Sequence, residues 1–357
     1  MDRNWSVRGY KDGDEHQINN LFNSVYEKSR SMEYWNWEFK SNPNGSKMLV
    51  AVDNDKIVGH LGALHREIKI GQDRKLASIE VDGMIHPDYR RQGMFVALGK
   101  RLLSESEKEG FYILYGFPNE KALPGHRKMN CTELFTPPVM VRPVNFKNIS
   151  CHMFSNRFLC FLTEKFSRFA FRMIFRVKSP KIEDNLIIKK VSEVDYRFDK
   201  FWEKACLSYP IILNRGSRNL DWRYLKCPEQ HYTIFAAEKK EKVLAIVVVR
   251  TLEKFDLKHG IVMDLLALPN HENALQSVLS RAMEHLEKKK VDLVACLIPK
   301  WSTYTKVLRR CGFIKYPRRL NPKEEPFIIY PISKDLNLDF VKDPKNWFIT
   351  WGDTDVV

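Results

Sequence analysis

An internal repeat constrains this chain more than any other feature. The segments WEFKSNP (Trp37–Pro43) and WRYLKCP (Trp222–Pro228) share a tryptophan, an aromatic residue two positions later and a final proline. They lie 185 positions apart (222 − 37 = 185), and Pro87 and Pro269 repeat at a separation of 182 (269 − 87 = 182). Duplication with small changes in loop length produces such an ordered series, whereas chance does not. The sequence therefore predicts two copies of one domain in tandem.

The length and composition agree with two domains. A chain of 357 residues exceeds one typical core, and its 44% hydrophobic content is enough to bury two. Each copy contains a hairpin-like pair of apolar runs, MLVAVDNDKIVGHLGAL in the first and TIFAAEKKEKVLAIVVV in the second. We predict a first domain over residues 1–145, a basic amphipathic linker over 146–185, a second domain over 186–335 and a C-terminal tail over 336–357.

A basic turn leads into an amphipathic helix in the segment HPDYRRQGMFVALGKRLL, residues 86–103. Upstream, LASIEVDGMI (residues 76–85) is apolar and β-branched enough to predict a strand. The first turn of a helix has backbone N–H groups without internal partners and a partial positive charge, so it binds anions. Gly93 lets a phosphate approach the main chain, and Arg90 and Arg91 add charge-assisted contacts. The pattern predicts a phosphate site where this helix begins.

The next segment, FYILYGFPNEKALPGHRKMNC (residues 111–131), predicts a second strand over 111–116 and a short helix that ends near Asn130. Together the two segments resemble the GNAT superfamily of acyl-CoA N-acetyltransferases, and RRQGMF resembles the branch with aminoglycoside-acetylating tandem enzymes. The R/Q-x-x-G-x-G/A loop of the family is matched by Arg90, Arg91, Gln92, Gly93, Met94 and Phe95. Its N-x-x-A-x-x-L-Y-x-x-x-G-F motif is matched by Asn119, Ala122, Gly125, His126, Asn130 and Cys131.

This resemblance implies an α/β (α+β) fold of two tandem GNAT-like domains, each a mixed, mostly antiparallel sheet flanked by helices. It also implies that the loop amides hold the pyrophosphate of acetyl-CoA, the acyl donor, while the pantetheine arm lies where two strands splay apart. Phe95 replaces a small residue of the motif, so we expect a less close approach of the helix to the phosphate. The residues expected to bind the donor are Gly83, Met84, Ile85, Arg90, Arg91, Gln92, Gly93, Met94, Phe95 and Asn119.

Catalysis requires a base that removes a proton from the amine acceptor. Glu80 and Asp82 lie on the strand that flanks the thioester in this fold. Asp82 has a counterpart in the second copy, Asp264, which suggests a structural task, so we rank Glu80 first and Asp82 second. His126 stands where many relatives have a tyrosine, and as an imidazolium it would protonate the leaving thiolate. The C-terminal carboxylate is a third candidate base, although we favour a loose tail.

The second copy departs from the donor-binding pattern. Arg90 to Gly93 align with Glu272 to Leu275, so an acid replaces an arginine and leucine replaces the glycine. A carboxylate beside a pyrophosphate is repulsive. We expect that the second copy does not hold coenzyme A and instead helps to wall the acceptor pocket, as the second half does in the aminoglycoside-acetylating tandem enzymes and in N-myristoyltransferases.

The linker segment 151–181 is basic and amphipathic. One helical face carries Phe154, Phe158, Phe161, Leu162, Phe169 and Met173, and the remainder carries Arg157, Lys165, Arg168, Arg172 and Arg176 with the single acid Glu164. Such a helix either packs its phenylalanines against the two sheets or makes peripheral contact with an anionic membrane. We favour packing, because so many exposed aromatics promote aggregation.

The remaining composition narrows the partners and the compartment. The formal net charge of +15 favours an anionic partner and tilts the expected acceptor towards an acidic or phosphorylated amine. Seven cysteines without a CxxC pair predict neither a disulfide framework nor a zinc site, and no metal is expected. Without an apolar signal segment or a membrane-spanning run, we expect a cytoplasmic protein, with an oligomer left open.

Three classes of function compete. We favour an acetyl-CoA-dependent N-acetyltransferase that acts on a primary amine, with a small molecule or sugar preferred to a protein. A tRNA-dependent aminoacyltransferase of the peptidoglycan-bridge type suits the positive charge but does not need the phosphate loop. A non-catalytic binder of nucleic acid or membrane is weaker, because the basic residues are interspersed with acidic ones.

Overall fold

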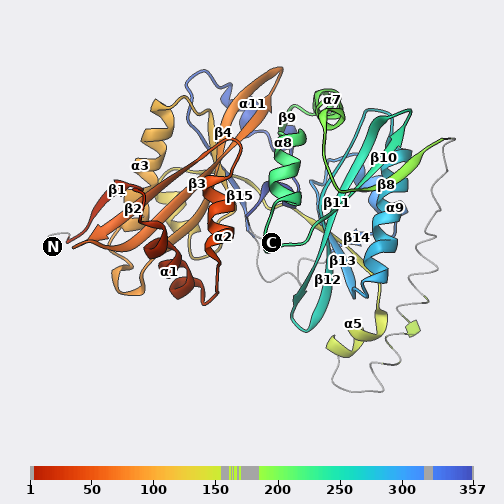
Figure 1. The fold of residues 1–357 in the computed structure, drawn as a ribbon, viewed down its shortest axis with the longest axis horizontal. Helices are drawn as coiled ribbons and strands as arrows, with labels where there is room; N and C mark the ends of the chain where they lie inside the picture. Colours follow the sequence, from red (N-terminus) through yellow and green to blue (C-terminus); the bar gives the residue numbers. More distant parts are fainter. Residues whose placement is uncertain are drawn as a thin grey trace.

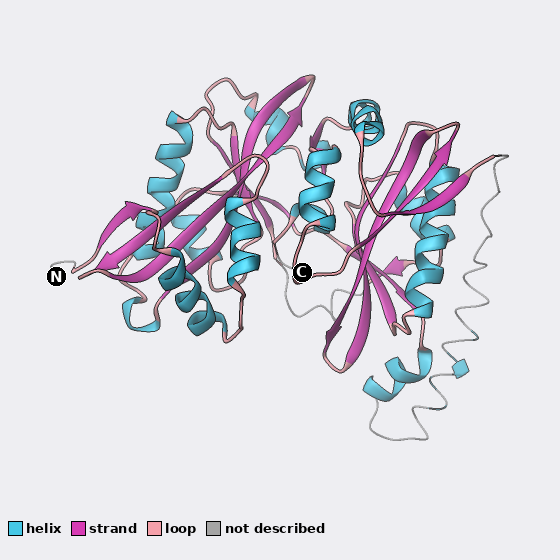
Figure 2. Cartoon of the chain, viewed as in Figure 1, coloured by secondary structure: helices cyan, strands magenta, loops and turns pink. Residues whose placement is uncertain are grey.

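The computed structural model describes residues 4–153, 161, 163, 165–166, 169, 185–316 and 325–355. Two lobes lie side by side, and each is a twisted sheet flanked by helices (Figure 1). Strands form the centre of both lobes and helices lie against their faces (Figure 2). Both lobes therefore have the mixed α/β architecture that the sequence predicts.

The sheet of the first lobe has the strand order β1-β2-β3-β4-β5-β15-β6. Its strands are β1 (Ser6–Gly9), β2 (Ser46–Asp53), β3 (Lys56–Ile70), β4 (Asp73–Ile85), β5 (Ile113–Gly116), β6 (Thr132–Phe135) and β15 (Phe327–Pro331). Its helices are α1 (Glu15–Tyr26), α2 (Met32–Trp35), α3 (Met94–Lys108) and α4 (Leu123–Lys128). Only β4 and β5 pair in parallel along this order; the other neighbours are antiparallel.

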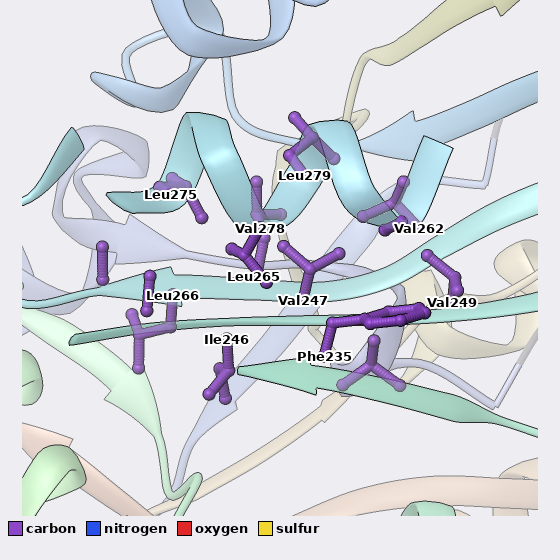
Figure 3. Close-up of a cluster of buried hydrophobic side chains, with 14 of the residues drawn as sticks. Phe235, Ile246, Val247, Val249, Val262, Leu265, Leu266, Leu275, Val278 and Leu279 are labelled. Atoms are coloured by element: carbon purple, nitrogen blue, oxygen red, sulfur yellow. The ribbon is translucent and has the colours of Figure 1, made fainter. Parts of the chain in front are cut away.

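The sheet of the second lobe has the order β14-β7-β13-β12-β11-β10-β8. Its strands are β7 (Val139–Pro143), β8 (Ile187–Val191), β10 (Thr233–Lys239), β11 (Lys242–Lys254), β12 (Leu257–Ala267), β13 (Leu293–Leu297) and β14 (Ile314–Lys315). Around it are α5 (Phe146–Met153), α7 (Tyr196–Ala205), α8 (Ser217–Leu220), α9 (Glu272–Lys288) and α10 (Tyr304–Arg310). Leu275, Val278 and Leu279 of α9 face the buried side chains of this sheet, as the helical spacing predicts (Figure 3).

The two lobes exchange one strand each. β15 comes from the C-terminal part of the chain, yet it lies between β5 and β6 of the first sheet and pairs with both. Reciprocally, β7 leaves the first lobe and pairs with β13 and β14 of the second sheet. The boundaries predicted near residues 145 and 186 therefore do not coincide with the membership of the sheets, because each sheet is completed by a strand from the other half.

The repeated tryptophans form the joint between the lobes. Trp37 and Trp222 lie in matching π-helical turns, Asn36–Lys40 and Asp221–Leu225. The indole N–H of Trp37 donates to the carbonyl of Trp222 at 2.7 Å, and that of Trp222 donates to the carbonyl of Trp37 at 2.9 Å. Their rings stack with centroids 5.2 Å apart. The residues matched by the repeat thus meet each other in one buried core.

The C-terminal segment is packed, so the expectation of a loose tail was wrong. After α11 (Leu338–Lys342), the strand β16 (Trp347–Phe348) pairs with β9 (Ile211–Leu213), which in turn pairs with β3 of the first sheet. The Trp347 and Ile349 side chains are buried, because they fill the core that the two lobes share. This segment therefore ties the second lobe to the first; residues 356–357 lie outside the described residues.

Most of the basic linker also lies outside the described residues, including Phe154, Phe158, Leu162, Met173, Arg157, Glu164, Arg168, Arg172 and Arg176. Phe161, Phe166 and Phe169 are described, and all three side chains are exposed. Packing of the linker phenylalanines against the sheets is therefore wrong for Phe161 and Phe169. Within the described ranges, no helix combines the length and hydropathy needed to cross a bilayer.

The described cysteines do not form a network. Cys151 is disulfide-bonded, whereas Cys131, Cys206, Cys227, Cys296 and Cys311 are free thiols. The free thiols are buried or half-buried, and burial raises the pKa of Cys296 above its ordinary value. They therefore act as small apolar side chains of the core.

The joint predicts a difference between two tryptophan variants. Trp37→Phe should lower the free energy of unfolding by about 1–3 kcal/mol more than Trp35→Phe does, because it leaves the buried carbonyl of Trp222 without its donor. Trp35 is a matched control, since it is equally buried and its indole N–H has no partner within the described part of the chain. Urea unfolding of both variants measures the difference. Equal losses would mean that the reciprocal bonds do not stabilise the joint.

Candidate active site

Strands β4 and β5 separate at the centre of the first sheet. Their parallel pairing runs from Ala77 with Ile113 to Ile79 with Tyr115 and then ends. The next residue on β4 is Glu80, which therefore lies at the fork. A bulge follows, because the register with β3 shifts at His60–Gly62 and Asp82 takes a left-handed φ of 52°. Bulges bend a strand, so the rest of β4 turns away from β5 and leaves its outer backbone groups without a partner strand.

Asp82 is fixed by an ion pair rather than free to act on a substrate. Its carboxylate accepts a hydrogen bond from the guanidinium of Arg30, which also contacts Glu38 at 3.2 Å and is buried. In the second lobe Arg215 contacts Asp264 at 3.1 Å. Arg30 and Arg215 are 185 positions apart, so the same arginine–aspartate pair recurs at the same bulge. This recurrence agrees with a structural task for Asp82.

The loop before α3 has the geometry of an anion site. Gly93 caps the helix with a φ of +80°, and a Cβ placed there would meet no atom within 4 Å. Arg90, Arg91 and Gln92 are exposed around it. Gln92 is held in place, since its side-chain oxygen accepts from the indole of Trp5 at 3.2 Å. Open space over unpaired first-turn amides is what a phosphate requires.

Phe95 does not obstruct this space. Its ring points inward, where a Cβ on Gly83 would come within 2.9 Å of it and a Cβ on Gly125 within 2.5 Å. The two glycines therefore make room for the phenylalanine that replaces the small residue of the motif. The ring edge also contacts the imidazole of His126, with centroids 5.2 Å apart. The bulk of Phe95 lies against Gly83 and Gly125, while the space at Gly93 is open.

The remaining residues expected at the donor site differ in which of their groups a ligand could contact. Met84 and Met94 are buried in the core, so neither side chain can meet a ligand. Ile85 is half-buried. The side-chain oxygen of Asn119 accepts from the N–H groups of Lys121 and Ala122 at 3.0 and 3.1 Å. Asn119 therefore shapes the turn before α4, and its amide nitrogen is the part left for a ligand.

Glu80 and His126 form a buried contact at the fork. Glu80 Oε1 lies 3.4 Å from His126 Nε2, and both side chains are more than nine-tenths buried. Burial raises the pKa of Glu80 to about 8, with a smaller contribution from the charge of Asp355. Burial also lowers the pKa of His126 to about 4. Near neutral pH the protonated acid therefore faces a neutral imidazole, and the imidazolium expected to protonate the thiolate is disfavoured.

One oxygen of Glu80 points to no protein group. Glu80 Oε2 is buried and has no hydrogen-bond partner among the described residues. An unpaired buried carboxyl oxygen costs free energy unless a ligand or water meets it. This oxygen is therefore a group of the fork that a ligand or water could satisfy.

Sequence reasoning missed Glu38, Asp355 and Arg223, which lie near this fork. Burial raises the pKa of Glu38 to about 8 and that of Asp355 to about 7, and the negative charge of Asp82 adds to both shifts. Arg223 donates to the carbonyl of Thr354 and so brings the C-terminal segment to this place. The 185-residue repeat that aligns Trp37 with Trp222 also aligns Glu38 with Arg223, a signal that could have found them.

The matching place in the second lobe is blocked. The hydroxyl of Tyr304 accepts from the N–H of Ala267 at 2.8 Å and lies 3.3 Å from its carbonyl. Ala267 is the repeat counterpart of Ile85, so a protein side chain already satisfies the backbone groups that would bind a pantetheine arm. A cavity of about 310 Å³ remains beside it, with Glu272 in its lining. The geometry agrees with a single donor site, in the first lobe.

No group of His, Cys, Asp and Glu in the described residues has the arrangement of a metal site.

Comparisons with known proteins find similarity in the N-terminal domain and in the fold. A family model described as an acetyltransferase (GNAT) domain matches residues 6–132. No protein of curated function matches the sequence. Among solved structures, a GCN5-related N-acetyltransferase from Anabaena variabilis is similar with a TM-score of 0.65 and 14% identity, covering 92% of this chain and 73% of the other.

Two further structures have the same fold. A probable N-acyltransferase from Enterococcus faecalis has a TM-score of 0.65 and 12% identity over 92% of this chain and 72% of the other. Eis1 from Mycobacterium abscessus has a TM-score of 0.58 and 11% identity over 92% and 73%. At these identities the likeness concerns the fold. Residues 6–132 match the model of an acetyltransferase (GNAT) domain, and the chain shares its fold with the N-acetyltransferase structures.

Proposed function

We propose that this protein is an N-acetyltransferase that uses acetyl-CoA as its acyl donor and a primary amine as its acceptor. The observation that supports this most is the fork between β4 and β5, which has Glu80 at its apex and the open helix cap at Gly93 on its flank. In such a fork the donor thioester would lie beside the free edge of β4, within reach of a carboxyl group. Arg90 and Arg91 would add charge to the amides that hold the pyrophosphate.

Glu80 is the proposed base. As a carboxylate it accepts a proton from the ammonium group of the acceptor, and the freed amine nitrogen then forms a bond to the thioester carbon. The backbone N–H groups of Gly83–Ile85, which no strand pairs on the outer edge, stabilise the negative charge that develops on the thioester oxygen. When the carbon–sulfur bond breaks, protonated Glu80 returns its proton to the thiolate, and the new amide nitrogen releases its second proton to solvent. In this scheme His126 stays neutral and holds the carboxyl in place.

The acceptor is proposed to be a cation. Four carboxyl groups surround the fork, those of Glu38, Glu80, Asp82 and Asp355, and they face two guanidinium groups, those of Arg30 and Arg223. Burial of so many acids raises the pKa of three of them towards neutrality, and a bound cation would relieve this strain. The net charge of +15 is that of the whole chain, so it does not describe the charge at this site. These surroundings favour a cationic amine over the anionic acceptor that the composition favours.

Donor binding is tested at the helix cap. Acetyl-CoA at about a hundred times its dissociation constant should stabilise the protein by about 2.7 kcal/mol, a shift visible in thermal melting. Gly93→Glu should abolish this shift, because it places a carboxylate where the pyrophosphate binds, whereas Glu272→Gln in the second lobe should retain it. Gly110→Glu is a matched control for backbone strain, since Gly110 has a φ of +79°, open space around it and a place at the opposite end of α3. Retention of the shift in Gly93→Glu would mean that the donor binds elsewhere.

The base is tested through pH. Because Glu80 acts as a carboxylate and its pKa is about 8, kcat/KM should rise with pH up to about 8 and then level off. Glu80→Gln should lower kcat about 10²- to 10⁴-fold with little change in donor affinity. Glu107→Gln, an exposed acid on α3, is the control. A retained rate in Glu80→Gln would move the base to another group.

The same pKa predicts a trend in stability that needs no substrate. The folded state binds the Glu80 proton more tightly than the unfolded state, so this stabilisation is complete below the ordinary pKa of 4.5 and is lost as pH rises through about 8. Glu80→Gln should flatten the decline of the melting temperature over that range. An unchanged slope would contradict the raised pKa.

Acceptor charge is tested with a panel assayed by thiol release. Spermidine, glucosamine and glucosamine 6-phosphate carry a primary amine on a polycationic, monocationic and phosphorylated body, respectively. We expect the highest kcat/KM for spermidine and the lowest for the phosphorylated sugar. Asp355→Asn should reduce the difference between them, because it removes one carboxylate of the site. A preference for the phosphorylated amine would overturn the cationic acceptor.

A further inference from the structure

The strand exchange brings a tyrosine of the second half to the active-site histidine. β15 pairs with β5 so that Tyr330 lies opposite Leu114, one strand from the fork. The hydroxyl of Tyr330 lies 2.8 Å from His126 Nδ1 and 3.4 Å from the His126 carbonyl oxygen. Tyr330 is buried like His126, so bulk water does not compete for these contacts. The result is a buried chain of three side chains, Tyr330, His126 and Glu80.

The protons along these three side chains follow from donor and acceptor capacity once one choice is made. A tyrosine hydroxyl has one hydrogen, and both His126 Nδ1 at 2.8 Å and the His126 carbonyl oxygen at 3.4 Å lie within its reach. When the hydrogen points to the carbonyl oxygen, His126 Nδ1 is the donor in its contact with the Tyr330 oxygen. A neutral imidazole carries only one N–H, so in that arrangement Nε2 is left as an acceptor that faces Glu80 Oε1. Only a protonated Glu80 can satisfy that acceptor.

We propose that Tyr330 is a positioning residue that fixes His126 in the Nδ1–H tautomer and thereby keeps Glu80 protonated in the free enzyme. In this way a residue of the second half of the chain determines which groups of the site in the first half carry a proton. The inference rests on the proposed function in one respect, since it takes Glu80 to be the base of the acetyl transfer.

Other titratable groups near these three side chains do not determine the tautomer of His126. Cys131, which follows α4, is half-buried, and burial raises the pKa of its thiol to about 11, so it stays neutral. Asp355 acts on Glu80 from the C-terminal segment, and its negative charge also favours the protonated acid. The pKa of Tyr330 itself is raised by burial, which keeps its hydroxyl neutral as well. Tyr330 is thus the group that selects between the two tautomers, while Asp355 adds to the outcome.

The first measurement is the tautomer itself. In protein labelled with ¹⁵N at its 10 histidines, two-bond ¹⁵N–¹H correlation spectra distinguish Nδ1–H from Nε2–H imidazole, and His126→Gln assigns the resonance. We expect the Nδ1–H tautomer in the unmodified protein at neutral pH. The Nε2–H tautomer there would overturn the proposal without any variant. This readout needs neither donor nor acceptor, so it stands even if the protein proves to transfer nothing.

The second measurement is the pH profile of Tyr330→Phe. Without the hydroxyl, His126 can adopt the Nε2–H tautomer and donate to an ionised Glu80, which stabilises the carboxylate. The rise of kcat/KM with pH should therefore move to lower pH by about one unit, and the histidine spectrum should gain the Nε2–H form. A lower rate with an unmoved profile and an unchanged tautomer would show that Tyr330 only supports packing.

Tyr115→Phe is the matched control. Tyr115 lies on β5 opposite Ile329, is fully buried, and its hydroxyl has no partner within the described residues. The variant removes the same hydroxyl from the same sheet, one strand away, and should leave both the tautomer and the profile unchanged. An equal shift in this control would assign the effect to general loosening of the sheet and overturn the role of Tyr330.

Discussion

The reciprocal bond between two tryptophans fixes how the halves of this protein meet. Each indole N–H of Trp37 and Trp222 is satisfied by the backbone of the opposite π-helical turn, so neither turn can shift without leaving buried polar groups unpaired. The same turns carry Glu38 and Arg223 towards the fork, and Arg223 holds the carbonyl of Thr354. The contact between the two tryptophans therefore positions both the carboxyl groups around the fork and the C-terminal segment that reaches them.

The charged groups around the fork differ from what the net charge of the whole chain would suggest. A chain with a net charge of +15 places four carboxyl groups around one fork. Low polarity and mutual repulsion favour the protonated forms of Glu38, Glu80 and Asp355, while burial favours the uncharged form of His126. The proton that an ion pair would place on the imidazole is thus held by the carboxyl group of Glu80. A carboxyl group with a pKa of about 8 can act as a base near that pH.

Local signals in the sequence predict the local parts of this structure well. Gly93 and Gly110 mark the ends of α3, and both take the left-handed conformation that favours glycine there. Asn130 does the same after α4, as expected for the residue that replaces a glycine of the motif. Each of these features depends on the backbone preference of one residue, so a single sequence is enough to find it.

Contacts between residues that are far apart in the sequence could not be predicted in this way. The strands VMVRP and FIIYP are short apolar runs at similar places in the two copies, and either would complete either sheet. Which sheet each strand joins depends on the path of the chain and on which strand edges are free to pair, and no local sequence pattern encodes either. Tyr330 was missed for this reason, because its contact with His126 exists only through the exchange. Arg30 and Arg215 were within reach, since the repeat that aligns the tryptophans aligns them as well.

The exchanged strands have a consequence for synthesis on the ribosome. When the first half of the chain has been made, its sheet lacks the strand between β5 and β6, which residues 327–331 supply in the folded protein. β7, made early, must wait for β13 before it finds a partner. Domains usually fold as they emerge, N-terminal first, but here the first sheet cannot be completed until residues 327–331 have been made, nor the second until β13 and β14 have. The nascent protein therefore carries unpaired strand edges until these strands emerge.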